Sequence, residues 1–210
     1  MKFSTIARMM LMAPSAIAQD LLQENETGYP TAIFVGIRND CNEFLYTNLV
    51  EQLTIALNGA HVQCFQTETT FTPVLAQGED ACNQVNNNPE FNNSPYINVV
   101  GVSQGGLVAR YMTEDCNLRN GGSVAHLLTL GTPNMGITAI PSGGCQELNP
   151  WSWDLYCQLE NLFMNGFAFT DTVKDGFAPS SYYRPPNDMS AYYNDSPFLA
   201  QENNEVNRGQ

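Results

Sequence analysis

The stretch from residue 97 to residue 112 constrains the fold of this chain more than any other part of the sequence. A run rich in β-branched residues enters Gly-Val-Ser-Gln-Gly, and apolar residues at helical spacing, Leu107, Val108, Tyr111 and Met112, follow it. This order predicts a strand that turns directly into a helix, with Ser103 at the turn.

Glycines stand two residues before and two residues after this serine. A side chain on Gly101 or Gly105 would collide with neighbouring backbone in so sharp a turn. The turn lifts the Ser103 hydroxyl to the carboxyl edge of a parallel sheet and aims the N–H of Gln104 at a developing oxyanion. The pattern indicates acyl transfer to serine, and a purely structural turn is the alternative.

The remaining chain alternates between strand and helix patterns. Strands are expected at 31–35, 61–65 and 124–130, and helices at the leucine repeat Leu45, Leu49, Leu53, Leu57, capped by Asn39 or Asp40, and at 74–85. Alternating strands and helices predict an α/β fold, with a mostly parallel sheet and helices on both faces. The 210 residues, of which 43% are hydrophobic, suffice for a single domain.

Chemistry in such sheets gathers where the strands end. Three strand exits are therefore expected to meet, at 36–40, at Ser103 and at 131–135. The loop after an early strand supplies the second oxyanion donor in this architecture, and the N–H of Ile37 is the candidate. An ordinary turn fits the same residues equally well.

Aromatic residues concentrate late in the chain. Twelve of the 22 aromatic residues lie between Trp151 and Phe198, among several prolines. This composition predicts a cap at about 139–200 over a sheet core at 19–138. An apolar groove under such a cap would gain about 0.8 kcal/mol for each buried CH₂ of a fatty-acyl chain. The alternative is that the aromatics form the core of the cap itself.

The N-terminus has the pattern of a secretory signal peptide, residues 1–18, with Lys2 and Arg8 before an apolar run and Ala16-Ile17-Ala18 at its end. A wrongly assigned start is the alternative. Asn25, Asn92 and Asn194 lie in glycosylation sequons, and the six cysteines are an even number. These features predict the secretory pathway, with a lysosomal or extracellular destination.

A formal charge of −13 argues against binding to nucleic acid or to an anionic membrane surface. No stretch after the leader is long and apolar enough for a transmembrane segment. No close C-x-x-C pair suggests a metal site, and no cofactor is expected.

Three segments together resemble the palmitoyl-protein thioesterases of the α/β-hydrolase superfamily: Val-Gly-Val-Ser-Gln-Gly-Gly at 100–106, Gly-Thr-Pro-Asn-Met-Gly-Ile at 131–137, and the region from Cys145 to Cys157. The similarity runs from about Pro30 to the end of the chain. It implies a serine hydrolase that removes palmitoyl groups from cysteine thioesters through an acyl-serine intermediate. S-acylated proteins or peptides and fatty-acyl thioesters would be its substrates.

The resemblance also implies roles for individual residues. Ser103 would be the nucleophile, and Gln104 and Ile37 would supply the oxyanion N–H groups. The acyl groove would include Thr132, Pro133, Met135, Ile137 and Ile140, and the disulfides would be Cys82–Cys116 and Cys145–Cys157. Cys41 and Cys64 then remain, and a bond between them is inferred only because they are the two cysteines left.

The chain departs from the family pattern in two places. The family loop His-Gly-hydrophobic-Gly-Asp is replaced by Val-Gly-Ile-Arg-Asn-Asp at 35–40. The family places its triad acid and histidine on loops after later strands, which are expected to be missing here, leaving the domain incomplete at its C-terminus. His61 and His126 are expected to be structural, and the cap residues Asp154, Asp171, Asp175 and Asp188 are expected to be solvated.

Two other functions remain open. One is a catalytically inactive, lipid-binding relative without the triad acid and histidine. The other is a general carboxylesterase or lipase, which differs from a thioesterase only in the leaving group.

Overall fold

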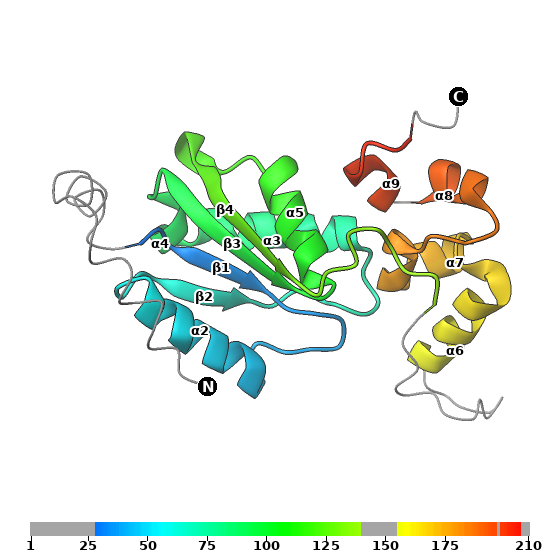
Figure 1. Ribbon diagram of the computed structural model, residues 1–210, viewed down its shortest axis with the longest axis horizontal. Helices are drawn as coiled ribbons and strands as arrows, with labels where there is room; N and C mark the ends of the chain where they lie inside the picture. The colour runs from blue at the N-terminus through cyan, green and yellow to red at the C-terminus, as the bar shows by residue number, and fades with distance from the viewer. Residues whose placement is uncertain (1–27, 140–154, 197, 207–210) are drawn as a thin grey trace, which may run out of the picture.

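The computed structural model describes residues 28–139, 155–196 and 198–206, and its framework is one parallel sheet (Figure 1). The strands lie side by side in the order β2-β1-β3-β4, and all three pairs are parallel. Their bounds are Thr31–Phe34 for β1, Val62–Phe65 for β2, Tyr96–Val102 for β3 and Ser123–Leu130 for β4. The predicted α/β fold is confirmed.

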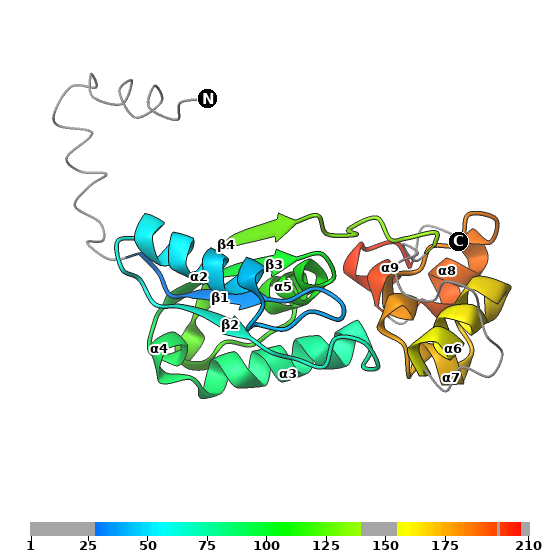
Figure 2. The same cartoon turned by 90° about the horizontal axis from the view of Figure 1, so that it is seen from below.

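Helices lie on both sides of this sheet. They are α2 at Phe44–Ala56, α3 at Val74–Asn87, α4 at Pro89–Asn92 and α5 at Gly105–Glu114, with the short 3-10 turn η2 at Arg119–Gly121. Figure 2 shows α2 on one face and α3 on the other. Successive side chains of β1 point to opposite faces of the sheet. Ala32 and Phe34 therefore pack in the cluster of α3 and α5, while Ile33 packs with α2.

Helix α2 differs from its predicted form in its buried face. Leu45, the first leucine of the repeat, is 54% exposed, whereas Tyr46 is fully buried. The N-cap residue is Glu43, which makes no side-chain capping bond. Asn39 does not cap the helix because its side chain bonds to Tyr46 and Glu43, and the Asp40 carboxylate accepts from Asn42 instead.

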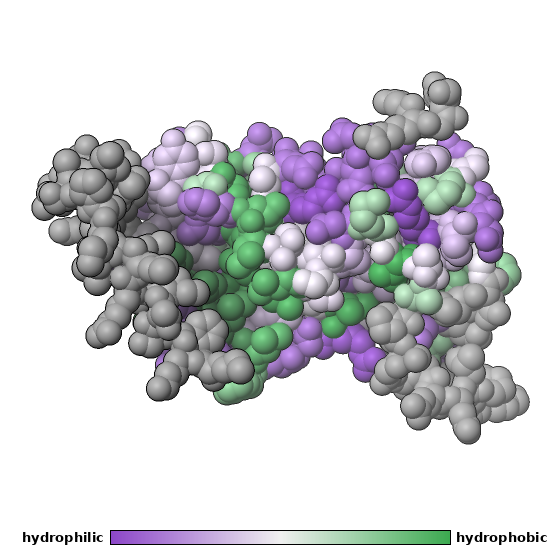
Figure 3. Space-filling view, viewed as in Figure 1, coloured by the Kyte–Doolittle hydropathy of each residue, from purple (hydrophilic) through white to green (hydrophobic). Residues whose placement is uncertain are grey.

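Strand β4 is less buried than its apolar sequence suggests. Leu127, Leu128 and Leu130 are 40%, 45% and 39% exposed. Within the described residues, β4 pairs only with β3. Hydrophobic residues form a stripe across this face of the molecule (Figure 3). The apolar pattern of 124–130 identifies a strand correctly, but burial depends on what covers it.

The predicted cap region is a set of short helical segments beside the carboxyl ends of the strands (Figures 1 and 2). They are α6 at Leu155–Leu162, the π-helical turn η3 at Phe163–Phe167, α7 at Asp171–Lys174, the 3-10 helix η4 at Ala178–Tyr182, α8 at Met189–Asp195 and α9 at Leu199–Glu202. Phe163 makes edge contacts with Phe177 and Tyr183, at centroid distances of 5.9 and 4.5 Å. These three aromatics therefore form a core of the cap itself.

Other cap residues join the main core. Tyr182, Tyr192, Phe198 and Leu199 are buried in the same cluster as Phe34 and Leu107. The cap is thus packed against the sheet domain by a continuous apolar interior.

An ionic cluster fixes the last part of the cap. Arg184 contacts both carboxylate oxygens of Glu205, at 3.3 and 3.4 Å, and the Tyr192 hydroxyl donates to the same carboxylate at 2.6 Å. Burial, the bond to Glu205 and its charge raise the pKa of Tyr192. The bonds from Tyr192 and Arg184 lower the pKa of Glu205 although its burial opposes them. Glu205 therefore stays ionised and tethers the chain after α9 to the cap.

Two disulfides lie within the described residues. Cys82 pairs with Cys116, as the family resemblance implies, and the leftover Cys41 and Cys64 are bonded to each other. Cys145 lies outside the described residues, so its pairing with Cys157 stays a prediction.

Several other predictions lie outside the described residues: the signal peptide at 1–18, the Asn25 sequon and the groove residue Ile140. Asn194 is exposed and Asn92 is half-buried, and their glycosylation stays a prediction. Of the helices that the structure describes, none has the length and apolar character needed to cross a bilayer.

Candidate active site

Ser103 stands between the end of β3 and the start of α5, in the predicted strand-to-helix turn. Its φ angle is 53°, in the left-handed region that non-glycine residues rarely adopt. A Cβ on Gly101 would overlap the backbone of Gly105 and Gly106. A Cβ on Gly105 would overlap the carbonyl oxygens of Phe34, the last residue of β1, and of Val35, which follows it. Both glycines are therefore required for this turn to pack against the sheet.

The turn is also held from the side of β4. The N–H of Ser103 donates to the carbonyl oxygen of Leu130 at 2.8 Å. A Cβ on Gly106 would overlap the side-chain oxygen of Thr132. The sequence analysis missed Gly106, whose lack of a side chain lets the loop after β4 pack onto the first turn of α5.

The loop after β1 lies directly against the serine. A Cβ built on Gly36 would be 3.1 Å from the Cβ of Ser103. The three strand exits therefore meet at one edge of the sheet, as the sequence predicts.

Tyr46 of α2 holds the loop after β1 through its hydroxyl group. Its hydroxyl accepts a hydrogen bond from the N–H of Gly36 at 2.8 Å and donates to Asn39 Oδ1 at 3.0 Å. Burial raises the pKa of Tyr46, although the bond from Gly36 opposes this rise. The hydroxyl therefore stays protonated and available to both partners. The sequence analysis missed this residue, since a tyrosine in an apolar helix carries no local signal for such a role.

Two backbone N–H groups in the loops around Ser103 have no acceptor within the described residues. Among the described residues, neither the N–H of Ile37 nor that of Gln104 donates a hydrogen bond to any group. Gln104 is only 1% exposed, so water does not readily replace an acceptor there. An oxyanion needs unpaired backbone donors of this kind, and the use of these two N–H groups by Ser103 stays a prediction.

Thr69 connects the two segments that carry these donors. Its Oγ1 accepts from the N–H of Arg38 at 3.0 Å, and its carbonyl oxygen accepts from Gln104 Nε2 at 2.8 Å. Gln104 Nε2 also lies 3.2 Å from Gln77 Oε1, and the hydroxyl of Tyr182 donates to Gln104 Oε1 at 2.9 Å. The side chain of Gln104 thus links the serine turn to the cap.

The loop at 35–40, where the sequence departs from the family pattern, has two replaced residues, Arg38 and Val35. Arg38, at the place of a family glycine, has a φ angle of 60°. Burial raises the pKa of Glu160 in α6, and the charge of Arg38 opposes this rise. Val35, at the place of the family histidine, is 3% exposed and packs in the cluster of Ile33 and Tyr46.

The expected groove residues follow the loop that leads from β4 to the cap. Thr132 Oγ1 is buried and has no hydrogen-bond partner among the described residues. Pro133 is half-buried, and Met135 is 65% exposed. Ile137 packs against the main core cluster, which contains Phe34, and against the cap cluster, which contains Phe163. It also forms a parallel bridge with Tyr183. This loop connects the serine turn to the cap, and its contact with an acyl chain stays a prediction.

The two histidines of the sequence lie away from this site. The Nδ1 atom of His126 bonds to Asn98 Oδ1 at 2.9 Å, and His126 pairs in register with Asn98. Leu130, whose carbonyl contacts Ser103, is four residues further along β4, a distance of about 13 Å in a strand. His61 immediately precedes β2 at the opposite end of the sheet and contacts Gln63. Neither histidine is placed to act on the serine.

The described cap carboxylates Asp171, Asp175 and Asp188 are exposed, as expected. The fourth, Asp154, lies outside the described residues. In the described residues, the Ser103 hydroxyl has no hydrogen-bond partner.

A parallel sheet with a serine on a strand-to-helix turn places this chain in the α/β-hydrolase class of folds. The chain belongs to the palmitoyl protein thioesterase family, whose family model matches residues 30–210. The match confirms the resemblance seen in the sequence.

Two similar proteins carry the family name. The palmitoyl-protein thioesterase-dolichyl pyrophosphate phosphatase fusion 1 of Schizosaccharomyces pombe is 25% identical over 186 residues, which are 84% of this chain and 28% of that protein. Palmitoyl-protein thioesterase 1 of Caenorhabditis elegans is 24% identical over 195 residues, which are 85% of this chain and 59% of that protein. The chain therefore spans less than two thirds of the length of either relative.

Proposed function

We propose that this chain provides the nucleophile and the oxyanion hole of a palmitoyl-protein thioesterase, which hydrolyses the thioester between a long-chain fatty acid and a cysteine. One observation carries the proposal: Ser103 stands on a strained turn beside two N–H groups that are unpaired among the described residues. The first belongs to Gln104 on the same turn, and the second belongs to Ile37 in the loop after β1. Family membership supports the choice of a thioester substrate.

In the proposed reaction, Ser103 Oγ attacks the thioester carbonyl carbon, and the N–H groups of Ile37 and Gln104 stabilise the negative oxygen that forms. The carbon–sulfur bond then breaks, and the cysteine leaves as a thiol. Water attacks the acyl-serine in the second half of the reaction, which releases the fatty acid and restores the serine hydroxyl.

The proton of the serine hydroxyl requires a general base. Neither His61 nor His126 is near Ser103, so we assign the role of general base to neither of them.

The loop at 132–137 is proposed to line the acyl chain, because it packs against the first turn of α5 at Thr132 and reaches the cap at Ile137. A palmitoyl chain has eight more CH₂ groups than an octanoyl chain. At about 0.8 kcal/mol per buried CH₂, even partial burial of this difference would favour the longer chain strongly.

We also assign the chain to the secretory pathway, with a lysosomal or extracellular destination. The disulfides Cys41–Cys64 and Cys82–Cys116 support an oxidising compartment. S-acylated proteins or peptides are the proposed substrates.

The decisive experiment incubates the full chain with a palmitoyl thioester and follows covalent acylation by intact mass, with mapping of the modified peptide. Ser103→Ala should abolish the adduct, whereas Ser123→Ala, at the exposed start of β4, should retain it. A faster reaction with palmitoyl than with octanoyl thioesters is expected. Faster acylation by short oxygen esters would instead indicate a general carboxylesterase.

A lipid-binding role without catalysis is the second candidate, and the distance of both histidines from Ser103 favours it. It predicts that a palmitoyl thioester binds wild type and Ser103→Ala equally and that no adduct forms. That result would refute the thioesterase proposal.

A further inference from the structure

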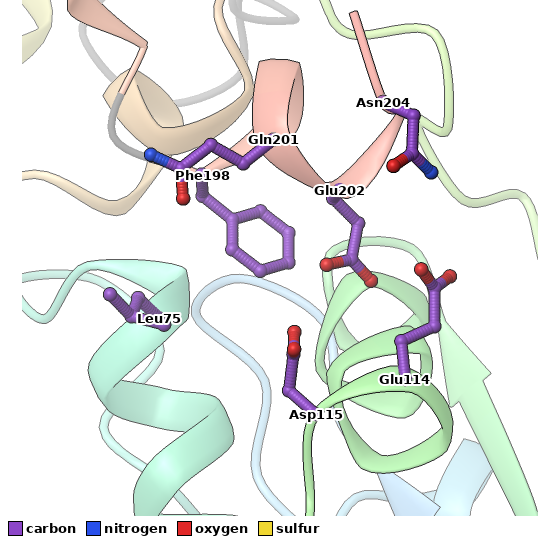
Figure 4. A pocket seen from close by; sticks show the side chains of 7 residues that line it. All are labelled: Leu75, Glu114, Asp115, Phe198, Gln201, Glu202 and Asn204. Carbon is purple, nitrogen blue, oxygen red and sulfur yellow. The ribbon is translucent and has the colours of Figure 1, made fainter. Parts of the chain in front are cut away.

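A pocket of about 250 Å³ lies at the far end of α5 from Ser103 (Figure 4). Its lining residues are Leu75, Glu114, Asp115, Phe198, Gln201, Glu202 and Asn204. Since α5 has ten residues, its two ends are about 15 Å apart. The pocket is therefore separate from the proposed active site.

The walls of this pocket differ in chemical character. Leu75, at the start of α3, and the ring of Phe198 give one apolar side, and three carboxylates lie across from them (Figure 4). Glu114 and Asp115 come from the end of α5, and Glu202 comes from α9. A guest with an apolar stem and a cationic end would match both sides.

Glu202 is the least satisfied of these groups. Its side chain is only 4% exposed, and its Oε1 atom is buried without a hydrogen-bond partner in the described structure. The Arg110 Nε atom is 3.7 Å from this oxygen, too far for a hydrogen bond. Arg110 directs its Nη atoms instead to Asn203 Oδ1 and to the backbone oxygen of Glu202, both at 2.8 Å. Glu202, which lines the pocket, thus has a long ion pair to Arg110 and no hydrogen-bond donor to its Oε1 atom within the described residues.

The local charge is also unbalanced. Glu114 and Glu202 both form ion pairs with Arg110, and Asp115 adds a third carboxylate to the pocket lining. Burial, together with the charges of Glu114 and Asp115, raises the pKa of Glu202 to about 7 against the opposing effect of Arg110. A second cation would lower the free energy of the ionised cluster.

A metal ion does not fit this arrangement. In the part of the chain that the structure describes, no three histidine, cysteine, aspartate or glutamate side chains converge closely enough to hold one. An ammonium group tolerates a wider set of carboxylates because its three N–H donors reach separate acceptors.

We propose that this pocket binds a primary alkylammonium group, namely the side chain of a lysine on a partner polypeptide. Its methylene groups would pack on Phe198 and Leu75, and its ammonium would donate to Glu202, Asp115 and Glu114. The formal charge of −13 on the chain favours the approach of a basic partner.

The test is a chemical-shift titration of the isotope-labelled full chain with Nα-acetyl-lysine methylamide at about pH 8, where Glu202 is mostly ionised. Saturable shifts are expected in α9 and at the end of α5. The norleucine analogue, which has the same stem without the amine, should cause none. Equal shifts with both compounds would overturn the proposal.

Variants at the exposed acids keep the test independent of folding. Glu114→Gln combined with Asp115→Asn removes two exposed charges and should weaken lysine binding about tenfold. Glu51→Gln, a matched change on α2, should leave binding unchanged. Identical affinity for the double variant and wild type would contradict the assignment.

Two further probes separate the sources of the cation. If a free diamine saturates the pocket while a lysine-containing peptide does not, the proposed polypeptide partner is wrong. If calcium ions shift these residues and lysine does not, the alkylammonium assignment is wrong. Ser103→Ala should bind lysine normally, so the outcome is independent of the proposed thioesterase activity.

Discussion

Replacing Tyr46 by phenylalanine tests how firmly the loop beside Ser103 is held. The change removes one oxygen and leaves the ring of this fully buried side chain in place. That oxygen accepts from the N–H of Gly36 at 2.8 Å and donates to Asn39 Oδ1 at 3.0 Å. Both bonds are lost, and the phenylalanine ring offers no replacement.

The expected loss of stability depends on how deeply the two hydrogen-bond partners of the Tyr46 hydroxyl are buried. Gly36 is buried, so its N–H would lose its acceptor without gaining water, at about 1–3 kcal/mol. Asn39 is half-buried and can turn to solvent, so its lost bond contributes about 0.5–1.5 kcal/mol. We expect Tyr46→Phe to lower the free energy of unfolding by about 2–3 kcal/mol, which corresponds to a drop in Tm of roughly 5–10 °C.

Urea denaturation measures this change, and hydrogen exchange localises it. The amides at 36–39 should exchange faster in the variant, while those of β3 should change only with global stability. Tyr96→Phe is the matched control, because the Tyr96 hydroxyl has no hydrogen-bond partner among the described residues and the side chain is 45% exposed. If the two variants unfold within 0.5 kcal/mol of each other, Tyr46 does not anchor the loop.

Thr69 holds the same loop from another side, and a double-mutant cycle can measure how the two anchors act together. Thr69→Val removes the acceptor of the Arg38 N–H while keeping a similar side-chain volume. If both anchors fix one loop conformation, the cost of the double variant should be smaller than the sum of the single costs, because the loop is already released by the first change. Strict additivity would indicate two independent contacts.

Three further predictions concern other parts of the framework. Gly105→Ala should destabilise the fold by about 3 kcal/mol or more in thermal unfolding, because its Cβ meets the backbone of β1, whereas Gly122→Ala should cost less than about 1 kcal/mol. Replacing Cys41 and Cys64 by serine opens a cross-link between residues 23 positions apart, and urea denaturation should show a loss of about 3 kcal/mol. Glu202 has a pKa of about 7, against an ordinary value of about 4.5. This predicts a contribution to stability that is complete below about pH 4.5 and lost as the pH rises through about 7, by up to roughly 3 kcal/mol. Glu202→Gln should flatten this part of the stability–pH curve.

The strands and the serine turn could be predicted because their signals are local. Short apolar runs with β-branched residues mark 31–35 and 97–102, and the glycines at 101 and 105 mark a turn that only small residues permit. The structure adds a third glycine, Gly106, whose role depends on Thr132, 26 positions away in the sequence. No local pattern could reveal that contact.

Burial was harder to predict than secondary structure. The leucine repeat in α2 indicates a helix, but Tyr46 is the side chain that the core takes up completely, because its hydroxyl satisfies the loop above it. The run at 124–130 is as apolar as a central strand, yet Leu128 is 45% exposed within the described structure. The hydrophobicity of a side chain favours its burial, but residues distant in the sequence determine whether that side chain is covered.

Gln104 shows why the site depends on a side chain that the nucleophile motif leaves unspecified. Its Oε1 accepts from the Tyr182 hydroxyl of the cap, and its Nε2 donates to the carbonyl of Thr69. Only an amide offers an acceptor and donors on one short side chain: glutamate would set a charge against the Thr69 carbonyl, and methionine would leave the partners in this buried position unsatisfied. Since Thr69 also holds the Arg38 N–H, one continuous set of hydrogen bonds runs from the cap through the serine turn to the loop after β1. A displacement of the cap is therefore coupled to the spacing of the two N–H groups that are proposed to stabilise the oxyanion.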